Sequence, residues 1–447
     1  MVSLEFRKFH LAAMNIWKTQ HQESTFKYRE PIIRWIDYGR RSWQRLGFIK
    51  IIASLASPSN TTNLEGMTKL LVTTVTSFIQ IPADIREEVI KYIRAHRYNR
   101  YTKIEGSNKV ELQDLFLSNP DLPSNTGAIT GDLEGAGYQH TVYVEIPSWA
   151  VDLRILRAKN YTLTDRGKSI SKLGEESLSS VRQFNKDQNP MLLTPGEQLF
   201  FLYCILDTDG DLIKTLFSNI VNKGLQKEFT REAIGIEVAN ALEDLVSLKM
   251  QKLTLTSDAA RTMVKRTNST IYSIRTLGQS PKEHFGTPRT EPLVDCGLLK
   301  KPEKADYRYC FSKGGYVFIK GLINAPSVSR FISTELAFYA SKLLKEELKP
   351  FSPNDESLRM VKKMLAQSYL DLRSGLGYCS IREVALLTAC QIFQQQSMFV
   401  EINDIERIIK DLSQQHSRGI RFTRSRQGDL SLMRIEMKLV KELINSE

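Results

Sequence analysis

RTEPLVDCGLLKKPEKADYRYCFSKGG, residues 289–315, is the stretch of sequence that decides the fold. Its first part predicts a helix that stops at Gly297, because glycine readily takes the left-handed conformation that ends helices. A charged break follows. Apolar side chains then alternate at Tyr309 and Phe311, as in a strand with one buried face, and the strand is expected to turn at Gly315. The predicted order is helix, break, strand and turn.

The same order occurs earlier in the chain. A helix is predicted to end at Asn160, and the segment Tyr161–Ser169, YTLTDRGKS, follows it. Its Tyr-x-Leu-Thr-x-x-Gly spacing copies the Tyr-x-Phe-Ser-x-x-Gly spacing of the later stretch. Tyr161 and Leu163 would share one face of a strand that turns at residues 165–167, where glycine tolerates positive φ. The sequence therefore predicts two copies of one unit.

A third copy closes the chain and has two helices before its strands. Ser380 and Asn403 predict the starts of helices over residues 381–395 and 404–415, because Ser and Asn side chains cap helix N-termini. Residues 419–435 largely alternate apolar and polar side chains about a Gly-Asp turn, which predicts a β-hairpin.

The segments PLVDCGLLKK and YRYCFSKGG resemble the passage from recognition helix to wing in prokaryotic winged helix-turn-helix proteins. The segment YTLTDRG and the helix, helix, hairpin order near the C-terminus are similar to the same superfamily. The resemblance implies a mainly α fold with small β-wings (α+β), built from tandem winged helix-turn-helix units. It also implies a double-stranded DNA partner, and a subunit of a prokaryotic phage-defence, restriction-like or mobile-element system.

The remaining sequence divides around these units. Apolar residues recur at helical spacing in Leu4–Trp17, Ile32–Trp43 and Leu70–Ile81, which predicts an N-terminal helical module joined to the winged units. Five parts are expected: the helical module (1–106), an irregular connection rich in Asn, Ser, Gly and Pro (107–138), a first winged-helix unit (139–190), a helical block with the second unit (191–325) and a C-terminal winged-helix unit (326–447).

The composition favours a polyanionic partner. Lys and Arg number 62 against 50 Asp and Glu, which gives a net charge of +12. The 5 cysteines and 6 histidines are dispersed without metal-ligand spacing, so we expect no metal, no cofactor and buried thiols in a reducing cytoplasm. The longest apolar run, residues 199–206, is far shorter than the roughly 20 residues that span a bilayer, so no membrane partner is expected.

Every predicted unit contains cationic or amide side chains that are expected at its surface. Side chains of these types make the contacts to DNA phosphates and bases. An ordinary solvated surface is the alternative in each case. Residues 91–103 also interleave aromatic and basic side chains, which suits stacking on bases. The candidate DNA-binding residues are Arg94, Arg97 and Arg100; Arg154, Arg157, Arg166 and Lys168; Arg289, Lys300, Lys301 and Arg308; and Arg407, Lys410, Gln414, Arg421, Arg424 and Arg426.

Two other functions compete with DNA binding by a non-enzymatic protein. Winged helices also dock partner proteins, so the chain could be a scaffold subunit of a larger complex. A Mg²⁺-dependent nuclease could instead use Asp429, Glu436 and Lys438, although the closing helix expected over residues 434–444 leaves little chain to build such a core.

The acidic segment DTDGD, residues 207–211, imitates a calcium loop. Its glycine is the fourth residue, whereas a calcium loop requires glycine at the sixth position. We therefore expect these carboxylates to cap a helix that begins near Leu212.

Overall fold

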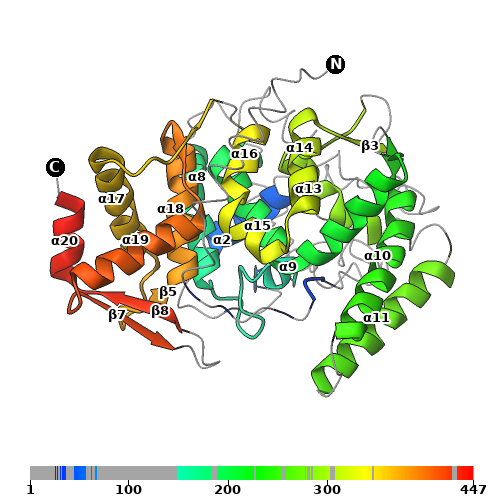
Figure 1. Ribbon diagram of the computed structural model, residues 1–447, viewed down its shortest axis with the longest axis horizontal. Coiled ribbons are helices and arrows are strands. Elements are labelled where there is room, and N and C mark those ends of the chain that lie inside the picture. Colours follow the sequence, from blue (N-terminus) through cyan, green and yellow to red (C-terminus); the bar gives the residue numbers. More distant parts are fainter. Residues whose placement is uncertain are drawn as a thin grey trace.

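The computed structural model describes most of the chain from residue 148 onward and a smaller part before it (Figure 1). The described residues are 45–56, 148–182, 189–225, 228–252, 258–276, 285–302, 308–344, 347–424 and 430–445, with single positions 26, 28, 31, 33–36, 62, 66, 67, 278 and 282. Within them the chain is mainly helical with small sheets, as the sequence predicts. None of the helices searched there combines the length and apolar character needed to cross a membrane.

The helices are α2 (Leu46–Leu55), α8 (Asp165–Arg182), α9 (Pro195–Asn222), α10 (Arg231–Lys252), α11 (Asp258–Thr276), the 3-10 helix η5 (Thr287–Arg289), α13 (Glu291–Asp295), α14 (Lys313–Asn324), α15 (Val328–Thr334), α16 (Leu336–Leu344), α17 (Asp355–Leu372), α18 (Ile381–Gln395), α19 (Ile402–Gln415) and α20 (Met437–Asn445). The strands are β1 (Phe229–Thr230), β2 (Leu299–Lys300), β3 (Arg308–Phe311), β4 (Lys349–Pro350), β5 (Cys379–Ser380), β6 (Met398–Phe399), β7 (Ile420–Arg424) and β8 (Leu430–Ile435).

Helix α9 lies at the centre of the described structure. It starts at a capping box in which Thr194 accepts the Glu197 N–H and the Glu197 side chain accepts the Thr194 N–H. Apolar side chains on almost every side of the helix are buried, and α8, α10, α14, α15, α16 and α18 all pack on it. The sequence predicts this start, because Thr194 is followed by Pro195 and, three residues on, by Glu197, and the structure confirms it.

Two parts of the chain share one topology. In the central unit (α9 to α14) the sheet order is β1-β3-β2, and in the C-terminal unit (α17 to α20) it is β5-β8-β7. In both, a long helix precedes the first strand, further helices separate it from a β-hairpin, and the last strand lies between the other two. The remaining pair, β4 and β6, is parallel.

The turns predicted at residues 165–167 and 313–315 are wrong, because both segments begin helices. The Thr164 hydroxyl accepts the Gly167 N–H (3.0 Å) at the start of α8. The Ser312 hydroxyl accepts the Gly315 N–H (2.8 Å) at the start of α14. A Ser or Thr side chain that caps a helix leads the backbone out of the strand and directly into the helix.

The repeated spacing nevertheless marks a repeated structure. Before α8, Leu156 forms an antiparallel bridge with Leu163, and before α14 the strands β2 and β3 form a hairpin. The Thr164 hydroxyl donates to the carbonyl oxygen of Arg154 (2.6 Å), and the Ser312 hydroxyl donates to that of Gly297 (2.7 Å). Arg154 and Gly297 both have positive φ, 61° and 77°. The two passages therefore share their turns as well as their caps.

Other expectations are corrected or confirmed element by element. Residues 33–36 are not helical, so the helix expected over 32–43 is wrong there. Helix α9 runs unbroken through residues 207–211, so those carboxylates cap no helix. The helix from Ser380 is confirmed, whereas α19 starts two residues before the expected position, at Ile402, with Glu401 at its N-cap. The closing helix starts only at Met437, because β8 occupies residues 430–435.

The hairpin expected over residues 419–435 is present as β7 and β8. Cys204, Cys296, Cys379 and Cys390 are buried free thiols, as expected, and Cys310 is half-buried.

The irregular connection at 107–138 and most of the N-terminal module lie outside the described residues. The boundaries between the five parts stay predictions.

Candidate nucleic-acid interface

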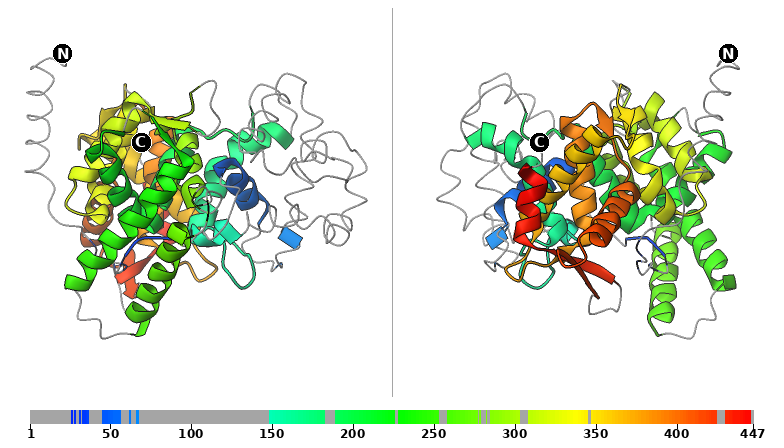
Figure 2. Two further views of the ribbon diagram at one scale, coloured as in Figure 1. Left: turned by 90° about the vertical axis from the view of Figure 1, so that its right-hand side faces the viewer. Right: turned by 60° about the vertical axis from the view of Figure 1, so that its left-hand side comes forward.

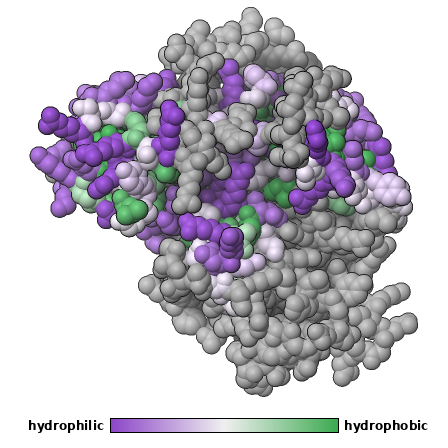
Figure 3. All heavy atoms as spheres, turned by 90° about the horizontal axis from the view of Figure 1, so that it is seen from below, coloured by the Kyte–Doolittle hydropathy of each residue, from purple (hydrophilic) through white to green (hydrophobic). Residues whose placement is uncertain are grey.

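The β7–β8 hairpin has one buried and one exposed face. Ile420, Met433 and Ile435 point into the core of the C-terminal unit, and Phe422 packs edge-on against Phe26 with ring centroids 5.2 Å apart. Successive side chains of a strand point to opposite faces, so the residues between these apolar positions face the solvent. Hydrophilic residues dominate the described surface at this end of the molecule, with only scattered hydrophobic ones (left in Figure 3).

Two arginines face each other across the exposed side of this hairpin. The register pairs Arg421 directly with Arg434, and both side chains are exposed. The Arg421 guanidinium is 3.9 Å from Glu436, and these side chains are 68% and 53% exposed, so the pairing is weak. Like charges directly opposite each other destabilise a sheet. Arg424, which is exposed near the turn, extends the same basic hairpin.

Helix α19 lies beside the hairpin and exposes only its second half. Ile405, Ile409 and Leu412 are buried, while Lys410 and Gln414 are exposed, as the sequence predicts. The first turn is covered, because residues 402–406 are all buried and Glu401 accepts the backbone N–H groups at the start of α16. The N-terminal end of this helix is therefore occupied by protein.

Most other candidates within the described residues lie at the surface. Arg154, Arg157, Lys300 and Arg308 are exposed, and Lys168, Lys301 and Arg407 are half-buried. Several form ion pairs: Arg308 with Glu228 (2.5 Å), Lys301 with the buried Glu291 (2.9 Å), Lys168 with Asp165 (3.1 Å) and Arg407 with Asp404. Arg94, Arg97, Arg100 and Arg426 lie outside the described residues.

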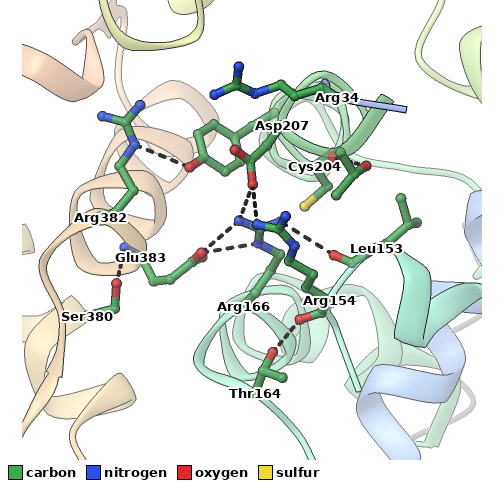
Figure 4. A network of polar contacts seen from close by, with 12 residues as sticks. Arg34, Leu153, Arg154, Thr164, Arg166, Cys204, Asp207, Ser380, Arg382 and Glu383 are labelled. Carbon is green, nitrogen blue, oxygen red and sulfur yellow. Dashed lines mark hydrogen bonds and ion pairs between the residues drawn. The ribbon is translucent and has the colours of Figure 1, made fainter. Parts of the chain in front are cut away.

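Arg166 is not a surface cation and is corrected as a DNA contact. Its guanidinium lies in the interior between α8, α9 and α18, where it contacts Asp207 (2.9 Å) and Glu383 (3.0 Å) (Figure 4). The guanidinium also lies over one face of the Tyr203 ring, 5.3 Å from the ring centroid. Burial of an arginine requires such carboxylate partners, and they come from distant parts of the chain.

Arg382, which precedes Glu383 on α18, extends this network to α15 and α19. Arg382 donates to Tyr203 (3.2 Å), Glu406 (2.9 Å) and Ser333 (2.7 Å). The network therefore joins α8, α9, α15, α18 and α19. It has the form of a structural junction, since Arg166 and Arg382 each contact carboxylate or hydroxyl groups from several helices.

The two carboxylates beside Arg166 respond differently to burial. Burial raises the pKa of Asp207, but the charges of Arg166 and Arg154 outweigh it and hold that pKa below its usual value. Burial also raises the pKa of Glu383, and there the nearby Arg166 does not fully compensate. Asp207 is the better-compensated anion because it contacts two guanidinium groups.

Arg289 is the second candidate DNA-binding residue that the structure shows to be buried. It is 2% exposed and pairs with Asp209 on α9 at 3.1 Å, and its guanidinium also donates to the carbonyl oxygens of Ile36 (2.6 Å) and Phe285 (3.1 Å). Asp207 and Asp209, which the sequence suggested as helix caps, are instead the interior partners of the two misassigned arginines. A side chain enclosed in this way cannot reach a phosphate group.

The sequence-based prediction missed one residue of the candidate interface. Arg434 belongs to the segment predicted as a hairpin, but only the strand register places it opposite Arg421. The alternation of side chains in residues 430–435 could have assigned Arg434 to the exposed face, because Met433 and Ile435 flank it as apolar positions.

The structure describes two of the three residues of the nuclease alternative. Glu436 follows β8, Lys438 is on α20, and both are exposed, while Asp429 lies outside the described residues. The described part of the chain contains no cluster of three or more His, Cys, Asp or Glu side chains that could hold a metal ion.

In comparisons with known proteins, no family model matches the sequence, and no curated protein or solved structure matches it.

Proposed function

We propose that the chain is a nucleic-acid-binding protein and that its C-terminal unit holds duplex DNA as a winged helix, with the β7–β8 hairpin as the wing. The facing pair Arg421 and Arg434 carries the proposal. Two cations placed opposite each other on an exposed strand face reduce stability, whereas a phosphate group bound at each of them would offset their repulsion. The net charge of +12 favours the same partner.

The topology of the C-terminal unit supports the winged-helix interpretation. A helix, a strand, two helices and a hairpin whose last strand lies between the other two are the arrangement expected of such a unit. The central unit has the same strand order, but α13, the helix before its hairpin, is only five residues long and exposes none of them, whereas α19 exposes Lys410 and Gln414 in its second half. We therefore assign DNA contact to the C-terminal unit and a structural role to the central hairpin.

The covered start of α19 limits how DNA would be read. Winged helices commonly use the N-terminal residues of this helix to contact base edges. Here Lys410 and Gln414, in the second half, are the exposed positions. We expect contacts to the phosphate backbone to dominate, with strong salt dependence and little sequence preference.

Replacing both facing arginines tests the proposal. Arg421→Ala/Arg434→Ala is expected to weaken binding to duplex DNA at least tenfold and to reduce the slope of log affinity against log salt by about 1.8, since each lost phosphate contact removes about 0.9. Fluorescence anisotropy across a salt series measures both. The matched control is Arg359→Ala/Lys363→Ala, which removes two exposed cations from α17 and should leave the slope unchanged.

Absence of any binding by the unaltered chain at low salt, to duplex or single strand, would reject the proposal and favour the scaffold alternative. Equal slopes for the hairpin variant and the unaltered chain would reject this site.

The stability of a single variant gives a second test. Arg434→Thr is expected to raise the free energy of unfolding by roughly 0.2–1 kcal/mol, because it removes a like-charge pair and introduces a residue that favours strands. The same variant should bind DNA more weakly. Denaturant unfolding measures the first effect and anisotropy the second. A loss of stability would show that Arg434 is held by favourable contacts and would remove the argument from repulsion.

A further inference from the structure

Helix α11 stands at the edge of the molecule. It packs mainly on α10, and the two helices project together beyond the body around α9, on the same side as the β7–β8 hairpin (Figures 1 and 2). Thr267, Thr270 and Ile274 are buried, and Ile271 is 8% exposed, so one side of α11 is fixed by packing. The opposite side faces the solvent along the helix.

The exposed side of α11 is basic. Arg261, Lys265, Asn268, Tyr272 and Arg275 recur at intervals of four and three residues and are all exposed. Residues at this spacing share one helix face. From the first to the last of them the face extends about 21 Å, at 1.5 Å per residue.

Charge is distributed differently in the two helices. After Asp258 at its start, α11 contains no acidic residue, and it carries four cations, Arg261, Lys265, Arg266 and Arg275. One exposed carboxylate of α10, that of Glu243, pairs with Arg275 at 2.5 Å. The charged residues of α11 are therefore mostly cationic, whereas α10 carries both signs of charge.

Tyr272 gives this face a second property. Its side chain is 69% exposed, far more than a core residue, and Asn268 and Arg275 lie about one helical turn away on either side. Cations for the backbone and an aromatic ring for bases or sugars are the combination used by nucleic-acid-binding surfaces.

We propose that this face of α11 is a second nucleic-acid contact, separate from the hairpin. It rests on the proposed function, since both surfaces would serve one nucleic-acid ligand. Two separated cationic surfaces on one side of the molecule would hold a longer stretch of nucleic acid than the C-terminal unit alone.

The test uses the whole 447-residue chain with fluorescently labelled duplex and single-stranded DNA. Arg261→Ala/Lys265→Ala removes two exposed cations one turn apart on α11. It is expected to reduce the salt slope by about 1.8 and to weaken binding several-fold at moderate salt. Arg359→Ala/Lys363→Ala has the same spacing on α17 and is the matched control, for which no change is expected.

Tyr272→Ala separates stacking from charge. Because tyrosine is neutral and stacks on unpaired bases, we expect at least about fivefold weaker binding to single-stranded DNA with an unchanged salt slope. Circular dichroism and thermal unfolding verify that each variant is folded.

The outcomes separate the two proposals. An α11 variant with the slope and affinity of the unaltered chain, while the hairpin variant loses both, overturns the second contact and leaves the proposed function intact. An unaltered chain that binds neither form of DNA overturns both. A slope lowered equally by the α17 control would assign the effect to net charge and also overturn the second contact.

Discussion

Arg166→Met is expected to lower the free energy of unfolding by about 3–5 kcal/mol, the cost of removing one partner from a buried ion pair. Methionine keeps the unbranched side chain but leaves Asp207 and Glu383 without the guanidinium that contacts both. Because these residues join α8, α9 and α18, the loss should weaken the packing between three helices (Figure 4). Denaturant unfolding followed by circular dichroism measures it.

Arg154→Ala is the matched control, because Arg154 contacts the same carboxylate at 3.2 Å from a side chain that is 58% exposed. An exposed ion pair contributes little, so the expected loss is below about 1 kcal/mol. Adding Asp207→Asn and Glu383→Gln to Arg166→Met should recover part of the stability by removing the uncompensated charges. Similar losses for Arg166→Met and Arg154→Ala would contradict the interior placement of Arg166.

Gly315→Ala is the second substitution with a large expected effect. In an exposed helix, replacing glycine by alanine stabilises by about 0.5–1 kcal/mol. At this position a Cβ atom would lie 2.0 Å from the carbonyl oxygen of Leu298, and this neighbour is backbone, which cannot rotate away. We expect a loss of about 3 kcal/mol or more, at or above the upper end of ordinary overpacking.

Two further glycines serve for comparison with Gly315, one in an equally tight position and one in an open position. Gly167→Ala should behave in the same way, because its Cβ would meet the carbonyl oxygen of Ile155 at 2.2 Å in the equivalent turn. Gly375→Ala, where nothing lies within 4 Å of the added atom, should change stability by less than about 1 kcal/mol. Thermal and denaturant unfolding of the three variants measures the effects. A neutral Gly315→Ala would mean that strand and helix are not held against each other at this turn.

Local signals were sufficient for much of the secondary structure. Thr194 and Ser380 cap helices where their sequences predict, because the side chain that marks the start also makes the hydrogen bond. The alternation in residues 419–435 gave the β7–β8 hairpin, because alternate side chains point to opposite faces of a strand. The repeated Thr/Ser-x-x-Gly spacing also marked a real repeat, but a capped helix and a glycine turn share those residue types, so its conformation was misread.

The candidate DNA-binding residues fall into two groups: those whose exposure the sequence predicted correctly, and those that the structure shows to be buried. Lys410, Gln414 and Arg421 were predicted as exposed because their apolar neighbours fix which face is buried. Arg166 and Arg289 had the same local appearance, yet they are interior, because their carboxylate partners are on α9 and α18, far away along the chain.

The β7–β8 hairpin shows which features the sequence determined and which features depend on the tertiary structure. The sequence by itself determined that the segment 419–435 contains two strands with one apolar face, since the pattern of side chains along a strand is local. Only the tertiary structure placed Arg434 opposite Arg421 and buried the first turn of α19, because strand register and helix packing depend on contacts between residues distant in sequence. That pairing carries the proposed function.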